Sequence, residues 1–179
     1  IAIIIDDMGN HWKQAERLID LPYPMTLAFL PHRKNTPALA RKAFRNKKEI
    51  MLHAPMENTL QLPLGDGALT SSMSENEIKE SLRDSLRSIP YVQGVNNHMG
   101  SLLTRHPGHM TWLMRELLRR NLFFVDSFTT ERSVALQMAL EVGVPAVRRN
   151  VFLDTNPDPD AVSMEFDRLL GLAHEQGYA

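Results

Sequence analysis

The chain has 179 residues, of which 43% are hydrophobic and 23% charged, and its 20 basic and 21 acidic side chains give a net charge of −1. These values are typical of one globular domain with a sizeable core, and the balanced charge argues against a general polyanion-binding surface. Cysteine is absent, which excludes disulfides, thiolate metal sites and a cysteine nucleophile. No apolar run approaches the ~18 residues that a membrane span needs.

The chain opens inside the apolar run of residues 1–5, with neither an initiator methionine nor a basic-then-apolar leader. This opening is typical of a domain cut from a longer chain. We therefore expect residues 1–179 to form a single domain that is truncated at both ends. A targeting segment would belong to the part that precedes Ile1.

Apolar runs and helical patterns alternate along the chain. Strands are expected at residues 1–5, 25–30, 50–52, 92–96, 122–125 and 146–153. Helices are expected at residues 10–19, 36–46, 107–120 and 130–142, behind Ser74, and from Pro159 onward. Six strand-then-helix units without a hairpin signal predict an α/β fold with a parallel sheet and helical crossovers, either open or closed into a barrel.

Local signals mark two helix starts and one long loop. Ser74 and Glu77 form a capping box in front of a helix. Thr36 and Pro37 are expected as the N-cap and the first-turn proline of an earlier helix. Residues 55–72 have few periodic apolar positions and are expected as a long loop, which in compact domains is often functional.

The carboxyl ends of the predicted strands carry the chemistry, because active sites of α/β proteins lie there. The Asp and His residues at these ends are Asp6, Asp7, His32, His53, His98, Asp126 and Asp154. Carboxylates and neutral imidazoles suit Zn²⁺ and related divalent ions. Asp7, His53 and His98 are therefore candidate metal ligands. The adjacent Asp6 is a candidate general base for a water that the ion activates.

These candidates also have simpler interpretations. The Asp6–Asp7 pair would equally serve to cap the first helix. His53 and His98 each follow an apolar strand, so either is also consistent with a hydrogen-bonded core histidine. The combination of both histidines with Asp7 favours a site over separate structural roles.

Three further polar residues at strand ends allow both a structural and a functional interpretation. Asp126 and Asp154 fit either capping or function, and Arg149 fits the orientation of a buried carboxylate better than direct contact with a substrate. The sequence lacks glycine-rich dinucleotide and phosphate-binding loops, the H-E-x-x-H motif and the G-x-S-x-G elbow. The usual nucleotide-binding, zincin and α/β-hydrolase classes are therefore excluded.

Five blocks at these strand ends carry a family resemblance. They are residues 3–9 (IIIDDMG), 52–57 (LHAPME), 96–101 (NNHMGS), 124–127 (FVDS) and 151–154 (VFLD). In content and order they resemble the signature blocks of the divergent polysaccharide deacetylases, which are related to the NodB-type carbohydrate esterases. The blocks span nearly the whole chain, and NNHMGS is highly specific. The resemblance implies a distorted (β/α) barrel of about seven parallel strands.

The resemblance also implies roles for individual residues. In NodB-type enzymes an Asp-Asp pair supplies the catalytic base and a metal ligand, which correspond here to Asp6 and Asp7. Two histidines of an H-x-x-x-H element complete the metal site of those enzymes. Here Glu57 stands four residues after His53, so His98 is the expected replacement and Glu57 the weaker candidate.

The other expected site residues are Asp126 and Arg149 for catalysis and Glu57, Asn97 and Asp154 for substrate binding. The sequence departs from the family pattern at Asn150, where members usually have Asp, which weakens a catalytic role at that position. Members also continue with a last strand that carries a Gly-His-Pro block. That strand would follow Ala179, so we expect the barrel of this chain to lack it.

The resulting hypothesis is a metal-dependent hydrolase that removes N-acetyl or O-acetyl groups from a cell-envelope polysaccharide or a peptidoglycan-type substrate. Zn²⁺ is the first choice of ion, with Co²⁺, Ni²⁺ or Mn²⁺ as others, and the resemblance implies a periplasmic or secreted bacterial protein. The altered H-x-x-x-H element favours an alternative, a non-catalytic envelope protein that binds glycan or a partner through the same cleft. A third hypothesis is a metal hydrolase of another amide or ester.

Overall fold

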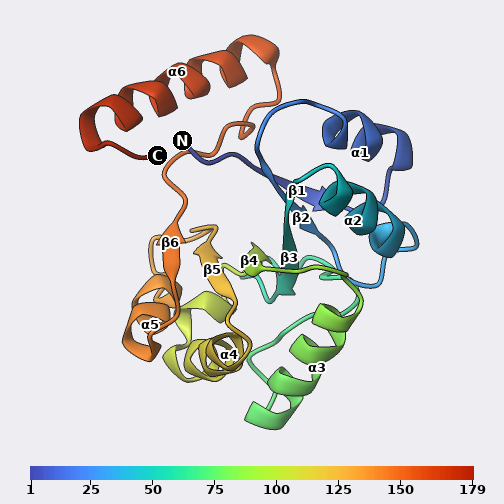
Figure 1. Ribbon diagram of the computed structural model, residues 1–179. Coiled ribbons are helices and arrows are strands. Elements are labelled where there is room, and N and C mark those ends of the chain that lie inside the picture. Colours follow the sequence, from blue (N-terminus) through green and yellow to red (C-terminus); the bar gives the residue numbers. More distant parts are fainter.

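The computed structural model describes residues 1–179 and alternates strands with helices along the whole chain (Figure 1). The strands are β1 (Ile4–Met8), β2 (Thr26–Phe29), β3 (Glu49–Met56), β4 (Gly94–Met99), β5 (Phe123–Asp126) and β6 (Ala146–Arg148). The α-helices are α1 (Trp12–Ile19), α2 (Thr36–Arg45), α3 (Glu75–Arg87), α4 (Pro107–Arg119), α5 (Ala135–Val142) and α6 (Pro159–Gln176), with a 3₁₀ turn, η1, at Leu103–Arg105. The alternation expected from the sequence is confirmed.

The six strands form one sheet in chain order, β1-β2-β3-β4-β5-β6, and every neighbouring pair is parallel. The sheet curls into a distorted barrel that stays open between β1 and β6, which do not pair (Figure 1). At this opening the two termini meet, and the Ala2 N–H donates to the Ala179 carbonyl at 2.9 Å. The structure thus has six strands where the resemblance implied about seven.

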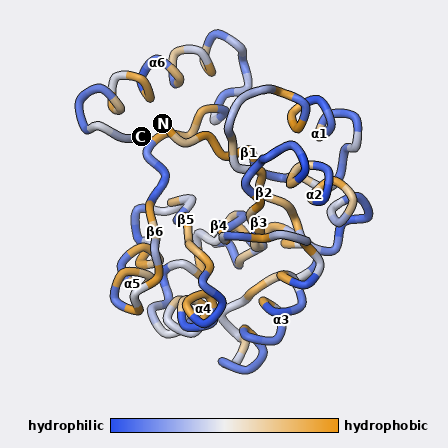
Figure 2. Tube along the Cα trace, in the orientation of Figure 1, coloured by the Kyte–Doolittle hydropathy of each residue, from blue (hydrophilic) through white to orange (hydrophobic).

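Two hydrophobic clusters lie on opposite faces of the sheet. The larger has 29 buried residues and packs strand positions such as Leu27 and Leu52 against helices α1 to α5. The smaller consists of Ala28, Met51 and Val125 and lies on the inner face of the curl. In Figure 2 hydrophobic segments concentrate in the strands, while hydrophilic residues follow the outer helices and loops. Beyond the small inner cluster, towards the carboxyl ends, the inner face becomes polar, and this is where the candidate site lies.

Strand boundaries differ from the expectation at the carboxyl ends. β1, β3 and β4 continue through the polar residues that were expected to end them, because parallel pairing goes on there, with His53 opposite Asn96 and Pro55 opposite His98. β6 is shorter than expected and ends at Arg148, since it has a neighbour on one side only. Polar residues in these strands are therefore part of the sheet and not of the loops behind it.

One predicted cap is confirmed and one is wrong. At α3, the Glu77 N–H donates to Ser74 Oγ at 3.4 Å and the Ser74 N–H donates to Glu77 Oε2 at 2.7 Å, which is the expected capping box. At α2 the N-cap is Asn35, and Thr36 is already helical. The Thr36 hydroxyl instead donates to the Leu30 carbonyl at 2.8 Å, so it ties the helix to the preceding strand.

The last helix, α6, lies beside the termini and packs loosely. Of its 18 residues only Leu169 is buried, while Met164, Phe166 and Leu170 are exposed. The expected start is confirmed, because the Asp158 side chain caps the helix ahead of a proline. None of the helices, α6 included, combines the length and the apolar character that crossing a membrane requires.

Candidate metal centre

Three side chains from three strands converge at the carboxyl end of the inner face: Asp7 of β1, His53 of β3 and His98 of β4, the triad. His53 Nε2 lies 3.0 Å from His98 Nδ1 and 3.5 Å from Asp7 Oδ1. His98 Nδ1 lies 3.2 Å from Asp7 Oδ1. Ligand atoms ~2.1 Å from a tetrahedral ion are ~3.4 Å from one another. The three donor atoms therefore fit a four-coordinate divalent ion with one position open.

An irregularity in β1 lets two consecutive aspartates reach the same histidine. Successive strand residues normally point to opposite faces. Here the pairing of β1 with β2 changes register between Ile5 and Met8, and Asp7 adopts a left-handed φ of 58°, which Asp tolerates better than most residues. Asp6 Oδ1 consequently lies 3.5 Å from His53 Nδ1, and Asp7 Oδ1 lies 3.5 Å from His53 Nε2. The two carboxylates flank the two nitrogens of one ring.

The electrostatics around Asp7 and His53 favour the protonation states that bind a metal. Hydrogen bonding from His98 holds the pKa of Asp7 below its ordinary value, which keeps this side chain an anion at neutral pH. Burial lowers the pKa of His53, which keeps the ring neutral. Metal ligation requires a deprotonated carboxylate and a neutral imidazole. The residues present therefore fit a divalent metal ion in chemistry as well as in spacing.

Asp126 and Arg149 lie at the same end of the sheet and brace the turn after β5. The buried Asp126 carboxylate accepts from the Phe128 N–H and from the Ser133 hydroxyl, both at 2.8 Å. Arg149 donates to the carbonyls of Ser127 and Phe128 at 2.7 and 3.3 Å. Burial lowers the pKa of Arg149, and the charges of nearby carboxylates oppose that effect. Arg149 thus binds backbone carbonyls where the sequence suggested a buried carboxylate.

Two of the expected substrate-binding residues, Asn97 and Asp154, form no hydrogen bond or ion pair with the triad. Asn97 is buried, and its amide accepts from the Ser127 N–H at 2.9 Å and donates to the Met99 carbonyl at 2.7 Å. These bonds let Asn97 support the connection between β4 and β5, and its expected contact with a substrate stays a prediction. Asp154 is exposed in the segment after β6, and no hydrogen bond or ion pair joins it to the triad.

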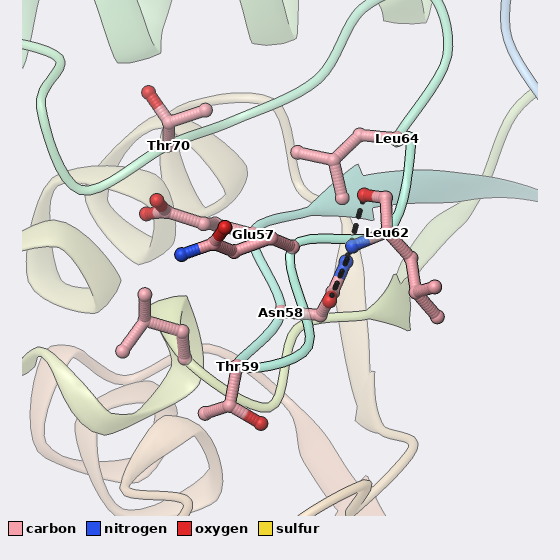
Figure 3. Close-up of a pocket in the computed structure, with 8 residues that line it drawn as sticks. Glu57, Asn58, Thr59, Leu62, Leu64 and Thr70 are labelled. Atoms are coloured by element: carbon pink, nitrogen blue, oxygen red, sulfur yellow. Dashed lines mark hydrogen bonds between the residues drawn. The ribbon is translucent and has the colours of Figure 1, made fainter.

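Glu57 follows β3 directly and lines a hollow of about 340 Å³, formed mainly by the loop behind that strand (Figure 3). Hydrogen bonds from Ser71, including its N–H at 2.7 Å, hold the pKa of Glu57 below its ordinary value. The loop is shaped by Asn58, whose Oδ1 accepts from the N–H groups of Leu60 and Leu62, each at 3.0 Å. Glu57 therefore belongs to this hollow and not to the triad.

Asn96 belongs to the site although the sequence pattern did not single it out. Its Nδ2 donates to Asp6 Oδ1 at 2.8 Å, and its Oδ1 lies 2.8 Å from His53 Nδ1. The expected strand ended at Asn96, whereas the observed strand β4 runs on to Met99. Because β4 continues to Met99, residues two apart share a face. Counting back by two from His98 would have found Asn96.

Fold and site together define a parallel α/β barrel with a candidate divalent-metal centre at the carboxyl ends of its strands. Residues 3–179 match the divergent polysaccharide deacetylases, and the chain belongs to this family. The uncharacterized protein YibQ of Escherichia coli is 33% identical over 177 residues, which are 99% of this chain and 56% of YibQ. An uncharacterized protein of Haemophilus influenzae is 32% identical over 179 residues, 100% of this chain and 64% of that protein. The chain thus spans less than two thirds of each relative.

A solved structure shares the architecture. The crystal structure of an uncharacterized protein from Agrobacterium tumefaciens superimposes with a TM-score of 0.93, covering 99% of this chain and 74% of that chain, at 24% sequence identity. At this identity the likeness speaks for the fold. The distorted barrel that the sequence resemblance implied is therefore confirmed.

Proposed function

We propose that the protein is a metal-dependent deacetylase that removes N-acetyl or O-acetyl groups from a cell-envelope glycan, in the periplasm or outside the cell. The observation that carries the proposal is the triangle of donor atoms from Asp7, His53 and His98, with a fourth side open. Membership of the divergent polysaccharide deacetylase family supports a carbohydrate substrate.

The residues around the triad divide the chemistry. A divalent ion held by the triad would act as a Lewis acid for an amide or ester carbonyl and lower the pKa of a water. Asp6 is half-buried, and Asn96 engages only its Oδ1. The other carboxylate oxygen is thus available to accept the proton of an attacking water. Asp126 and Arg149 support this arrangement by holding the adjacent turn.

The hollow beside Glu57 is the proposed place for a sugar ring of the substrate. Glu57, Leu62, Leu64 and Thr70 line it, and Figure 3 shows the Glu57 side chain extending to the side of Thr70, with Leu62 and Leu64 on the opposite side. Carboxylate and hydroxyl oxygens suit sugar hydroxyl groups, and leucine side chains suit the apolar face of a ring. Glu57 is therefore the residue expected to contact the glycan.

The test is release of acetate from N-acetylated chitooligosaccharides and from peptidoglycan fragments. The protein is loaded in turn with Zn²⁺, Co²⁺, Ni²⁺ or Mn²⁺, and metal-free protein serves as the blank. We expect release that depends on the ion and is lost in Asp6→Asn. The exposed Asp167 of α6 provides a matched control, because Asp167→Asn makes the same chemical change far along the chain from the site.

Two other outcomes would overturn the proposal. Glycan binding without acetate release from any metal form would support the non-catalytic envelope protein. Hydrolysis of simple esters or other amides, with no release from either glycan, would support a metal hydrolase of a different substrate.

A further inference from the structure

We infer that Asn96 is a positioning residue whose single amide sets the tautomer of the metal ligand His53 and fixes the carboxylate of Asp6. The inference rests on the proposed function, which gives His53 and Asp6 their roles. It adds a residue that touches neither the ion nor the substrate, yet decides which atom of His53 can bind the ion.

The orientation of the Asn96 amide follows from its neighbours. An ionised carboxylate only accepts hydrogen bonds, so the NH₂ group must face Asp6, whose Oδ1 is 2.8 Å away. The amide oxygen then faces His53 Nδ1 at 2.8 Å and can only accept. His53 Nδ1 must therefore carry the proton. Asn96 is only 2% exposed and pairs opposite His53 in the sheet, so its amide is held between these two partners.

This tautomer places the lone pair of His53 where the triad needs it. A neutral imidazole with a proton on Nδ1 has its lone pair on Nε2. Nε2 is the atom that lies 3.0 Å from His98 Nδ1 and 3.5 Å from Asp7 Oδ1. Without the Asn96 acceptor at 2.8 Å, Asp6 Oδ1 at 3.5 Å is the acceptor that remains beside Nδ1, so the ring is held less firmly against moving its proton to Nε2, where it would block the ligand atom. An outer hydrogen bond of this kind typically changes metal affinity 10–100-fold.

The NH₂ group of the Asn96 amide acts on Asp6. This carboxylate lies only 3.5 Å from His53 Nδ1, so both the amide oxygen and Asp6 Oδ1 approach the same ring nitrogen. The donated bond from Asn96 holds Asp6 on the Nδ1 side of the ring, away from the triangle of donor atoms at Nε2. Asp6 thereby stays a base and does not become a fourth ligand.

Two substitutions separate the two bonds. Asn96→Asp keeps an acceptor for His53 Nδ1 but removes the donor to Asp6, while Asn96→Ala removes both. Asn97→Ala is the matched control, because the neighbouring amide is also buried, at 1% exposure, and also makes two hydrogen bonds, but none to the site. All three variants are expected to lower the stability of the fold, so stability by itself does not distinguish them.

The first readout is the affinity of each metal-free variant for Zn²⁺ and Co²⁺ by titration. We expect Asn96→Ala to bind about 10–100-fold more weakly than wild type, and Asn96→Asp and Asn97→Ala to bind like wild type. Asn96→Asp should nevertheless lose acetate release, because Asp6 is no longer held. The inference is wrong if Asn97→Ala weakens binding as much as Asn96→Ala, or if Asn96→Asp binds as weakly as Asn96→Ala.

The second readout is the tautomer of His53, measured by ¹⁵N NMR on the metal-free wild-type protein at neutral pH. We expect a protonated Nδ1 and an unprotonated Nε2, and a protonated Nε2 would overturn the inference. This measurement needs neither an ion nor a variant that folds. If no ion binds the wild type, the proposed function fails while the tautomer still decides the role of Asn96.

Discussion

The contact between helices α3 and α4 and the triad each place a carboxylate beside nitrogen-bearing side chains, but the carboxylate of Glu116 is buried and that of Asp7 is exposed, and their partners differ. Glu116 of α4 is 1% exposed, and Arg83 of α3 holds it with two bonds, at 2.9 and 3.0 Å. Arg120 adds a bond at 2.7 Å and Arg119 another at 3.3 Å. Both oxygens of Glu116 therefore have charged donors from the protein itself.

At the triad no arginine or lysine approaches the carboxylate, and the neighbouring nitrogen-bearing groups are the two histidines. Asp7 Oδ1, His53 Nε2 and His98 Nδ1 approach one another within 3.5 Å, and a hydrogen bond from His98 lowers the pKa of Asp7. The backbone is also left-handed at Asp7 and Met99, with φ values of 58° and 56°. A buried carboxylate whose two oxygens have charged donors is structural, whereas a carboxylate that only histidines approach offers ligand atoms to a divalent ion.

The largest expected effect is on metal content in His98→Ala. Loss of one of three ligand atoms should reduce affinity by more than the ~100-fold that the loss of an outer partner causes. Elemental analysis after loading and dialysis measures the bound ion. His174→Ala, in the exposed part of α6, should keep wild-type content. Equal metal in the two variants would remove His98 from the site.

The second largest expected effect is on the turnover number of the Asp6→Asn variant. The base contributes ~10²–10⁴-fold to proton transfer, so the turnover number should fall by that factor while metal content stays at the wild-type level. Acetate release and the amount of bound metal ion are measured on the same preparation of each protein. A parallel loss of ion would mean that Asp6 is a ligand, not the base.

The pH dependence of stability should distinguish the α3–α4 contact from the triad. The hydrogen bonds from Arg83 lower the pKa of Glu116 from 4.5 to about 2, which corresponds to about 3 kcal/mol of stability at neutral pH. Glu116→Gln should cost about 2 kcal/mol after allowance for solvent around the partly exposed arginines. Because the folded pKa is the lower one, this difference is full above pH 4.5 and shrinks as the pH falls towards 2. Urea unfolding at several pH values measures it.

Two results would contradict this account of Glu116. One is a difference between wild type and Glu116→Gln that does not change with pH. The other is a change in metal affinity in Glu116→Gln, since this contact is expected to be independent of the triad.

The smallest effect concerns the capping box of α3. Ser74→Ala removes the acceptor for the Glu77 N–H, and loss of such a cap costs ~1 kcal/mol. Chemical denaturation should show this loss, with metal binding and acetate release unchanged. An unchanged unfolding midpoint would mean that the cap adds nothing to the stability of the domain.

The fold could be predicted from the alternation of apolar runs and helical patterns, because parallel strands with helical crossovers follow from it. The triad residues could also be named, since Asp7, His53 and His98 stand near the carboxyl ends of three strands. Their contact could not be derived from periodicity alone. It depends on the register change in β1, which turns Asp7 towards the side that Asp6 already faces.

A second difference at the site comes from the extension of strands through polar residues. Because β4 includes Asn96 to His98, the alternation of faces puts Asn96 at the site and Asn97 behind it. Asp126 caps the following turn with two hydrogen bonds, and its expected role in catalysis stays a prediction. The sequence shows which polar side chains stand near the strand ends, but the register of the strands decides which of them come into contact.

The most direct test of the central claim is titration of metal-free protein with Zn²⁺, Co²⁺, Ni²⁺ and Mn²⁺ by calorimetry. Wild type is compared with the triple variant Asp7→Ala, His53→Ala, His98→Ala, after circular dichroism has shown that both are folded. The account predicts one ion per wild-type chain, bound far more tightly than by the triple variant. If wild type binds none of the four ions more tightly than the triple variant, the metal centre is contradicted and the hydrolase proposal falls with it.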